Sequence, residues 1–521
     1  MNEDHLDRLR RDLEAADFRL ARIRALIGAS ADDSRLRGVF APARHALSRH
    51  EPSPLVSLVR LCLLGDSLGA EVLDRAFASL GVEGARELGL VETVPSSPEH
   101  YRAAIALNPV ALPDPSAARH GGEVEWWLLS DLDDALRRGP ARSDHVMGAG
   151  RATRSLLAQA PFATYADMSD VVALDLGTGC GVVAMCLARA GARRVVATDI
   201  SPRALAFAKA NVLLNGLAGP IEFRQGSLFE PLAGEAFDLI LANPPFVITP
   251  RDASVPVYEY RDAGLAGDEL VRSVVTTAPS YLSERGSLIC LANWEYRWGH
   301  SGLERVAEWV RDAERNAGPL AAWVIERDRA SPAEYAETWA RDGGTRPGDS
   351  RFEELVNAWL HDFEARRVTS VGLGAVRIAA VPEPQRVVRE EHIGEPIATV
   401  AGDALHHSMR SGVIAEAMSD AEMLSAHWLV AEGVTEQREH RPGEASPKGI
   451  VLRVRTPFDR SVVVDSVLAG AVGACDGDLS LAQIADALTE LLELDAQACT
   501  EALLSGFREL CWFGIVAPAS E

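Results

Sequence analysis

The sequence lacks a long apolar run, a signal-like N-terminus and closely paired cysteines. No stretch of about twenty uncharged apolar residues occurs, and the charged start from Met1 to Asp7 does not resemble a signal peptide. Membrane spanning and secretion are therefore not expected. The seven cysteines are scattered and form no C-x-x-C pair, which argues against a disulfide framework and a structural zinc site. We expect a cytoplasmic globular protein without a metal site.

Length and charge limit the domain count and the partners. The 521 residues exceed a single domain of about 200 and predict two or three units, each able to bury a core. The formal net charge of −23 repels phosphate backbones, although a local basic face can persist within an acidic total. No DNA partner is expected. The sequence indicates no oligomeric state.

The most informative feature is the tetrapeptide Asn243-Pro244-Pro245-Phe246, which ends the apolar run Phe237–Ala242. Two prolines cannot donate backbone hydrogen bonds, so the strand must stop there with free carbonyl acceptors. The Asn243 carbonyl adds an acceptor, and Phe246 offers a ring for stacking. Such a turn would grip a planar NH2 group. Taken alone, the tetrapeptide is equally well explained as a strand-ending turn.

A second pattern lies about sixty residues upstream. The apolar segment Val171–Leu176 leads into the glycine-rich turn Gly177–Gly181, and a helical composition follows. Glycines let the backbone turn sharply and approach a ligand, and the helix offers unpaired N–H groups. The next strand, Arg194–Thr198, ends in Asp199, where a carboxylate can accept ribose hydroxyls. Because the glycine spacing is not that of dinucleotide-binding proteins, a nucleoside without a pyrophosphate fits better.

Together these residues resemble the class I S-adenosylmethionine-dependent methyltransferases, in the HemK-like branch with an N-P-P-(Y/F) motif. Four features match in order over roughly residues 120 to 300: Asp175–Gly181, Asp199–Leu205, Gly226–Pro231 and Asn243–Phe246. The resemblance implies an enzyme with an α/β, doubly wound, Rossmann-like sheet of seven strands. It implies S-adenosyl-L-methionine as the cofactor and methylation of a planar nitrogen.

The resemblance also implies roles for individual residues. Gly177 and Gly179 would pass beneath the methionine part of the cofactor, Asp199 would hold the ribose, and Asn243 would position the substrate nitrogen. The family often has an acid after the glycine of the third motif, where this chain has Ser227, so adenine recognition would rest there on the backbone or the hydroxyl. The implied cofactor-binding residues are Asp175, Gly177, Thr178, Gly179, Gly181, Asp199, Ile200, Ser227, Leu228 and Asn243. The implied catalytic residues are Asn243, Pro244, Pro245 and Phe246.

Candidate substrate contacts lie after the tetrapeptide and at a later strand end. The segment Tyr258–Glu269 partly resembles the acid and glycine segment of HemK-type glutamine methyltransferases, although an acidic helix cap explains its end equally well. Tyr258 and Arg261 are expected at the substrate mouth with Phe246. Asn293 and Trp294 lie at the C-terminal end of the expected strand 287–293, where doubly wound sheets place ligands.

One segment before the first strand, Asp144–Gly150, is expected to lie over the methionine end of the cofactor. We expect His145 within it to be structural rather than a general base.

Modules are expected on both sides of the catalytic domain. Residues 1–115 predict a mainly helical, winged-helix-like module that either recruits substrate or covers the catalytic domain. The methyltransferase domain is expected at 120–384. Residues 385–521 predict a C-terminal module, winged-helix-like from about residue 460, whose acidity favours protein contact or dimerisation over DNA.

The substrate class stays open between alternatives. The favoured substrate is a protein glutamine side-chain amide, supported by net acidity and by the partial HemK-like segment. The alternatives are an adenine or guanine exocyclic amine in ribosomal or transfer RNA and a small-molecule nitrogen. A non-catalytic scaffold is disfavoured because Asp175, Asp199 and Asn243 are all present. A basic groove near Phe246 would favour RNA, and a neutral or acidic one protein.

Overall fold

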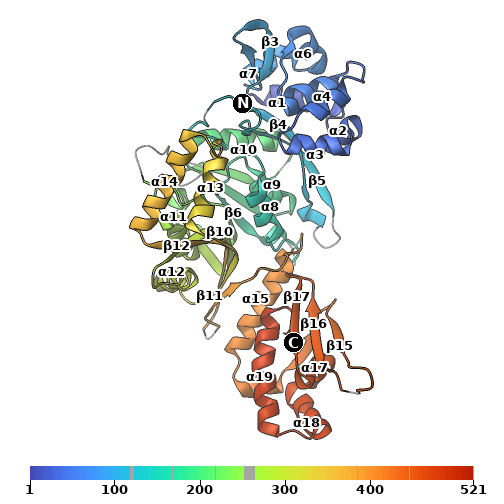
Figure 1. Ribbon diagram of the computed structural model, residues 1–521, viewed down its shortest axis with the longest axis vertical. Helices are drawn as coiled ribbons and strands as arrows, with labels where there is room; N and C mark the ends of the chain where they lie inside the picture. Colours follow the sequence, from blue (N-terminus) through green and yellow to red (C-terminus); the bar gives the residue numbers. More distant parts are fainter. Residues whose placement is uncertain are drawn as a thin grey trace.

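The computed structural model places three units along one long axis (Figure 1). The N-terminal helices lie at one end, the large sheet lies in the middle, and the C-terminal helices and strands lie at the other end. None of the helices in the described part of the chain is both long and apolar enough to cross a bilayer. The structure describes residues 1–117, 122–139, 141–165, 168–217, 219–251, 264–383, 385–399, 401–444 and 446–519.

The central unit is a Rossmann-like sheet, which confirms the predicted fold class. Its order is β13-β11-β12-β10-β9-β6-β7-β8. The five strands from β10 to β8 are parallel, whereas β12 runs antiparallel to both β10 and β11. The strands are β6 (Val172–Leu176), β7 (Arg194–Asp199), β8 (Ile221–Gln225), β9 (Phe237–Ala242), β10 (Leu282–Arg297), β11 (Leu320–Ala330), β12 (Val368–Ala380) and β13 (Val387–His392).

The sheet contains one strand more than the seven expected. The additional strand, β13, pairs in parallel with β11 and lies beyond residue 384, where the catalytic domain was expected to end. The other seven strands account for the predicted sheet. The sheet therefore continues into the chain that leads to the C-terminal module.

Helices cover both faces of this sheet. All five residues of β6 are buried, and alternate residues belong to different hydrophobic clusters: Ala173 to one, Leu174 and Leu176 to the other. This burial on both faces is typical of a parallel sheet. The helices of this unit are α8 (Arg151–Ala158), α9 (Val182–Arg189), α10 (Pro202–Leu214), α11 (Glu269–Thr277), α12 (Gly302–Ala317), α13 (Pro332–Asp342) and α14 (Ser350–Ala365).

The N-terminal unit is mainly helical and ends in a small antiparallel sheet, β1-β3-β2. Its hydrophobic cluster runs from Leu6 to residues of the central sheet without a break. The elements are α1 (Glu3–Ala15), α2 (Leu20–Ile27), α3 (Ala29–Leu36), α4 (Ala41–Leu47), α5 (Pro54–Leu58), a π-helical turn (Val59–Leu63), β1 (Leu68–Gly69), α6 (Ala70–Ala76), α7 (Gly81–Glu87), β2 (Val91–Val94) and β3 (Ser97–Ala103).

A β-hairpin of β4 (Ala106–Pro113) and β5 (Glu123–Ser130) joins this unit to the catalytic sheet. Side chains of α10 hold β5 in place, because Asn211 and Asn215 bond the backbone of Leu129 and Trp127. The Trp127 indole in turn donates to the Phe18 carbonyl at 2.7 Å. The end of β5 is therefore fixed beside α10.

The C-terminal unit packs against the outer edge of the sheet. Trp323 of β11 contacts Phe458 and Trp512, with ring centroids 6.3 and 5.4 Å apart. Residues 464–516 were expected to form three helices followed by a strand, and the structure has these elements with one further strand, β18, between the first and second helices. The elements are α15 (Gly402–Ala417), α16 (Asp420–Ser425), β14 (His427–Val430), β15 (Thr435–Glu439), β16 (Gly449–Val454), β17 (Arg460–Val464), α17 (Ser466–Gly473), β18 (Asp476–Ser480), α18 (Leu481–Leu492), α19 (Ala496–Trp512) and β19 (Val516–Pro518).

Candidate active site

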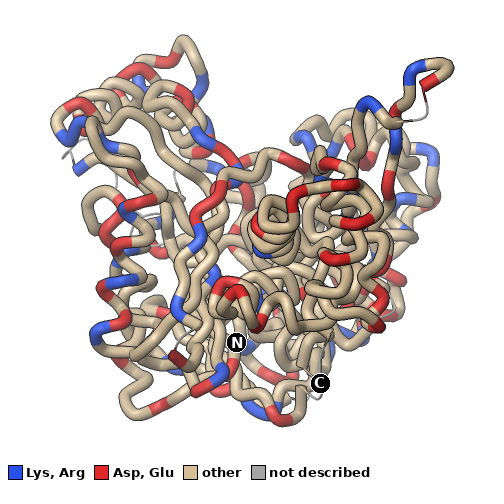
Figure 2. The backbone as a smooth tube through the Cα atoms, turned by 90° about the horizontal axis from the view of Figure 1, so that it is seen from below, with Lys and Arg blue, Asp and Glu red and all other residues tan. Residues whose placement is uncertain are grey.

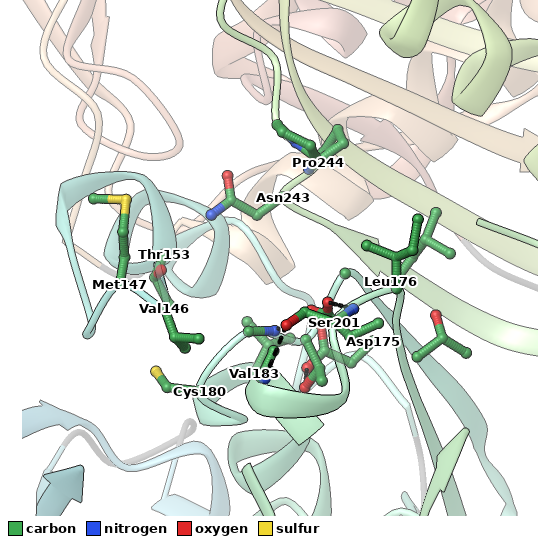
Figure 3. A pocket seen from close by; sticks show the side chains of 18 of the residues that line it. Val146, Met147, Thr153, Asp175, Leu176, Cys180, Val183, Ser201, Asn243 and Pro244 are labelled. Carbon is green, nitrogen blue, oxygen red and sulfur yellow. Dashed lines mark hydrogen bonds between the residues drawn. The ribbon is translucent and has the colours of Figure 1, made fainter. Parts of the chain in front are cut away.

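A cavity of about 210 Å³ lies at the carboxyl ends of β6, β7 and β9 (Figure 3). Doubly wound sheets place their ligands at this edge. The structure brings to it most of the residues predicted to bind a cofactor: Asp175, Gly177, Thr178, Gly179, Asp199, Ile200, Ser227, Leu228 and Asn243. Pro244 and Pro245 line it as well.

The three glycines of the turn after β6 have different structural roles. All three have positive φ: 75° at Gly177, 54° at Gly179 and 88° at Gly181. A Cβ added at Gly177 or Gly179 would meet no atom within 4 Å, so the backbone there borders open space. A Cβ at Gly181 would lie 2.8 Å from the Cβ of Ala208. Gly181 therefore permits helix packing and does not line the cavity.

Two carboxyl groups fix the backbone of this turn. Oδ2 of Asp175 accepts from the Thr178 hydroxyl at 2.6 Å and from the Ala184 N–H at 2.9 Å. Oδ2 of Asp199 accepts from the Gly179 N–H, and Oδ1 accepts from the Ser201 N–H, both at 2.9 Å. Burial raises the pKa of Asp175 to about 7 and also raises the pKa of Asp199. Asp199 keeps further lone pairs at the end of β7 for a ligand.

The third motif, Gly226–Pro231, contributes both polar and apolar groups to the cavity. The Ser227 N–H is already used, because it donates to Oε2 of Glu230 at 3.1 Å. Leu228 has a positive φ of 48°, and Ile200 is 53 % exposed. Ile200 and Leu228 thus offer apolar contact to a flat ring, while the Ser227 backbone donor is taken.

Asn243 presents the cavity's unused acceptor. Its Oδ1 atom is buried and has no hydrogen-bond partner among the described residues. Figure 3 shows the side chain reaching from the end of β9 into the cavity, with Met147 opposite. Leaving a buried acceptor unpaired costs roughly 1–3 kcal/mol. Such an atom is suited to a ligand that brings its own N–H donors.

The segment before α8 forms another wall, as its position in the sequence predicts. Asp144 to Gly148 and Thr153 line the cavity. Asp131, just after β5, accepts from the Val146 N–H at 2.8 Å and from both terminal nitrogens of Arg203 at 2.5 Å. Burial opposes ionisation of Asp131, but the Arg203 and Val146 hydrogen bonds outweigh it and lower its pKa.

His145 faces the same carboxylate. Its side chain is 9 % exposed, and Nδ1 lies 3.6 Å from Oδ2 of Asp131. Burial lowers the pKa of His145. This environment suits the structural role expected from the sequence. No role was expected from the sequence for Asp131 or for Arg203, although Arg203 lies within the motif Asp199–Leu205.

Several predicted substrate residues are not brought to the cavity. Asn293 and Trp294 are 2 % and 0 % exposed and bond Tyr335 and Glu326 instead. They are buried because β10 continues beyond the end of β9. There it still pairs with β12, and α12 covers Trp294. Phe246 is half-buried against both hydrophobic clusters and does not line the cavity. Tyr258 and Arg261 lie outside the described residues.

A family model matches the central part of the chain. Residues 151–318 fit the methyltransferase small domain. Residues 15–104, in the N-terminal unit, match a domain of unknown function.

Three bacterial methyltransferases match a part of the chain. The ribosomal protein uL3 glutamine methyltransferase of Bordetella pertussis is 40 % identical over 125 residues, which are 22 % of this chain and 42 % of that protein. The release factor glutamine methyltransferase of Geobacter sulfurreducens is 38 % identical over 124 residues, 22 % of this chain and 43 % of that one. The ribosomal protein L11 methyltransferase of Pelotomaculum thermopropionicum is 51 % identical over 69 residues, 13 % and 22 % of the two chains. The chain thus spans less than half the length of these three relatives.

Proposed function

We propose that this protein is an S-adenosylmethionine-dependent N-methyltransferase that acts on a planar nitrogen, with a protein glutamine side-chain amide as the favoured substrate. The observation that carries the proposal is the buried Oδ1 of Asn243, which has no hydrogen-bond partner among the described residues and lies in a cavity bordered by the glycine turn Gly177–Gly181. Glutamine methyltransferases among the relatives support the choice of an amide.

The cavity's residues fit the cofactor. The open space beside Gly177 and Gly179 would admit the methionine part, and Asp199 would accept the ribose hydroxyls with its remaining lone pairs. Ile200 and Leu228 would contact the adenine ring. When bound, S-adenosylmethionine supplies an electrophilic methyl group on a sulfonium.

Asn243 and Pro244, which both line the cavity, would hold the substrate nitrogen. The Asn243 carbonyl and the Pro244 backbone carbonyl accept the two N–H protons, which returns lone-pair density to a nitrogen otherwise conjugated with its carbonyl. On methylation of the amide, one of these two protons would leave to water. Because positioning supplies much of the rate, no strong base is required.

The charge of the chain favours protein over RNA as the substrate. Figure 2 shows Lys and Arg positions interspersed with Asp and Glu positions throughout the view. A net charge of −23 weakens the phosphate contacts that dominate binding of nucleic acids. A protein amide therefore fits the surface better than an RNA base.

The test is transfer of radiolabel from the cofactor to components of a cell extract, with Asn243→Ala as the control. Samples are digested with ribonuclease or with protease, and labelled protein is hydrolysed to identify N5-methylglutamine. Label that survives ribonuclease and is released by protease supports the proposal. Label released by ribonuclease alone overturns the protein substrate in favour of RNA.

A further inference from the structure

An exposed tryptophan stands on a rigid turn at the end of β10. Trp298 is 76 % exposed, although most large apolar side chains of the sheet are buried. Arg297 and His300 bond each other's backbone, and the Trp298 N–H donates to the Arg367 carbonyl at 2.8 Å. Gly299 completes the turn with a φ of 79°. The backbone that carries the indole is therefore held in place by these bonds.

The surface beside Trp298 presents arginines over buried carboxylates. The side chains of Asp268 and Glu295 are 0 % exposed, whereas the side chains of Arg297 and Arg366 that bond Glu295 are 36 % and 22 % exposed. Arg305 bonds Asp268 at 2.7 Å and is 15 % exposed. Arg366 also pairs with Asp362, whose side chain is 22 % exposed, so only at Asp268 and Glu295 are the carboxylates fully buried beneath more exposed arginines.

Arg367 differs from these arginines in its ion pairing. It is exposed, and no ion pair joins its side chain to a carboxylate among the described residues. We call the surface formed by Trp298, Arg297, Arg366 and Arg367 the tryptophan edge.

The tryptophan edge lies on the substrate side of the sheet. Cys290 of β10 is opposite Ala242, the residue before Asn243, and β10 continues from there to Arg297. The Asp268 carboxylate accepts a hydrogen bond from the Glu295 N–H at 2.9 Å. Asp268 directly precedes α11, and Leu270 of that helix lines the cavity. A macromolecule whose amide reaches Asn243 would meet the tryptophan edge with its flanking surface.

We propose that the tryptophan edge docks an acidic segment of the protein substrate, with an apolar side chain of that segment packed on Trp298. This inference rests on the proposed function. Tryptophan and arginine are the residues that dominate binding energy at protein interfaces. A nucleic acid is disfavoured because Arg367 is the one arginine of the tryptophan edge without an ion pair among the described residues, which suits a single carboxylate, whereas a phosphate backbone is tracked by a series of free cations.

The test measures binding of fluorescent glutamine peptides to the full-length protein by anisotropy. Three peptides share a central Phe-Gln and differ only in flanking Glu, Ser or Lys residues, and a single-stranded oligouridylate is the fourth probe. The variants are Trp298→Ala and Arg367→Glu. Leu491→Ala is the matched control, because Leu491 is 77 % exposed in α18 of the C-terminal unit.

We expect the Glu-flanked peptide to bind at least about tenfold more tightly than the Lys-flanked one. Trp298→Ala should weaken that binding about tenfold and Arg367→Glu about fivefold, while Leu491→Ala leaves it unchanged. Equal binding of all peptides, or no effect of Trp298→Ala, would overturn the inference. Binding of the oligouridylate that Trp298→Ala abolishes would overturn it in favour of RNA.

Methylation of the same peptides separates this inference from the proposed function. Binding through Trp298 without methyl transfer to any probe would support the docking surface and count against glutamine methylation. Methyl transfer that is equally fast in wild type and Trp298→Ala at low peptide concentration would support the function and overturn the docking surface.

Discussion

The cavity has two halves that differ in how their polar groups are bonded. In the cofactor half, formed by the ends of β6 and β7, the carboxyl groups of Asp175 and Asp199 both accept hydrogen bonds from the protein. In the substrate half, at the end of β9, the Asn243 oxygen has no partner among the described residues. The first half is fixed by short loops after two parallel strands. The second is one turn after β9, followed by a segment whose residues 252–263 lie outside the described part of the chain.

This difference indicates how binding energy is divided. A cofactor used in every turnover gains from a site whose backbone is already ordered, because no ordering cost is added on binding. The substrate half instead carries an unsatisfied acceptor, which a ligand N–H group relieves at the place where charge develops. Substitutions in the two halves should therefore affect different kinetic constants.

The largest expected effect is that of Asn243→Ala, which tests whether the two halves are separable. Methyl transfer should fall by about a thousandfold or more, because the acceptor that acts in the transition state is removed. Cofactor affinity, measured by calorimetric titration, should stay within about threefold of wild type. Loss of cofactor binding in that titration would show that the halves are coupled.

Asp199→Ala is the reciprocal test in the cofactor half. Loss of the ribose acceptor, and of the bonds to the Gly179 and Ser201 N–H groups, should weaken cofactor binding about a hundredfold. At saturating cofactor the turnover rate should recover to within a few-fold of wild type. A turnover rate that stays low at saturation would mean that Asp199 also contributes to the transition state.

The cofactor half was readable from sequence because its determinants are local. Gly177 and Gly179 are required by backbone angles in one turn, and Asp199 follows directly from a strand end. Asp131 and Arg203 are 72 residues apart, and only the folded chain brings them together. Their pairing leaves no local pattern.

The substrate half was less readable because strand length is set by neighbours. The expected strand 287–293 made Asn293 and Trp294 look like residues at a ligand edge. In the fold β10 runs over Leu282–Arg297, so both side chains are interior and the exposed end is Trp298. The eighth strand was missed for a related reason, since β13 gains its partner only from β11.

A moderate effect is expected from Asp131→Asn. This substitution tests whether the cavity wall formed by Asp144–Gly148 contributes to cofactor binding. The substitution removes the charge that Arg203 pairs with and so loosens the segment that carries Val146. We expect cofactor affinity to fall about tenfold and the turnover rate at saturation to change little. Arg203→Ala should give the same loss, and the double variant no further loss, if the pair acts as a unit.

The smallest expected effect concerns the pH dependence of stability set by Asp175. Burial raises its native pKa from the ordinary 3.8 to about 7, so the native state holds a proton that the unfolded state has released. The stabilisation is fully present below the unfolded pKa and is lost as the pH rises through 7. Between pH 6 and 7.5 the free energy of unfolding should fall by about 1 kcal/mol through this group. Urea unfolding of wild type and Asp175→Asn at both pH values isolates this contribution, because other titrating groups are common to the two proteins. An equal pH dependence in both would mean that Asp175 stays ionised, and that the cofactor half bears a buried charge compensated by the Thr178 and Ala184 donors alone.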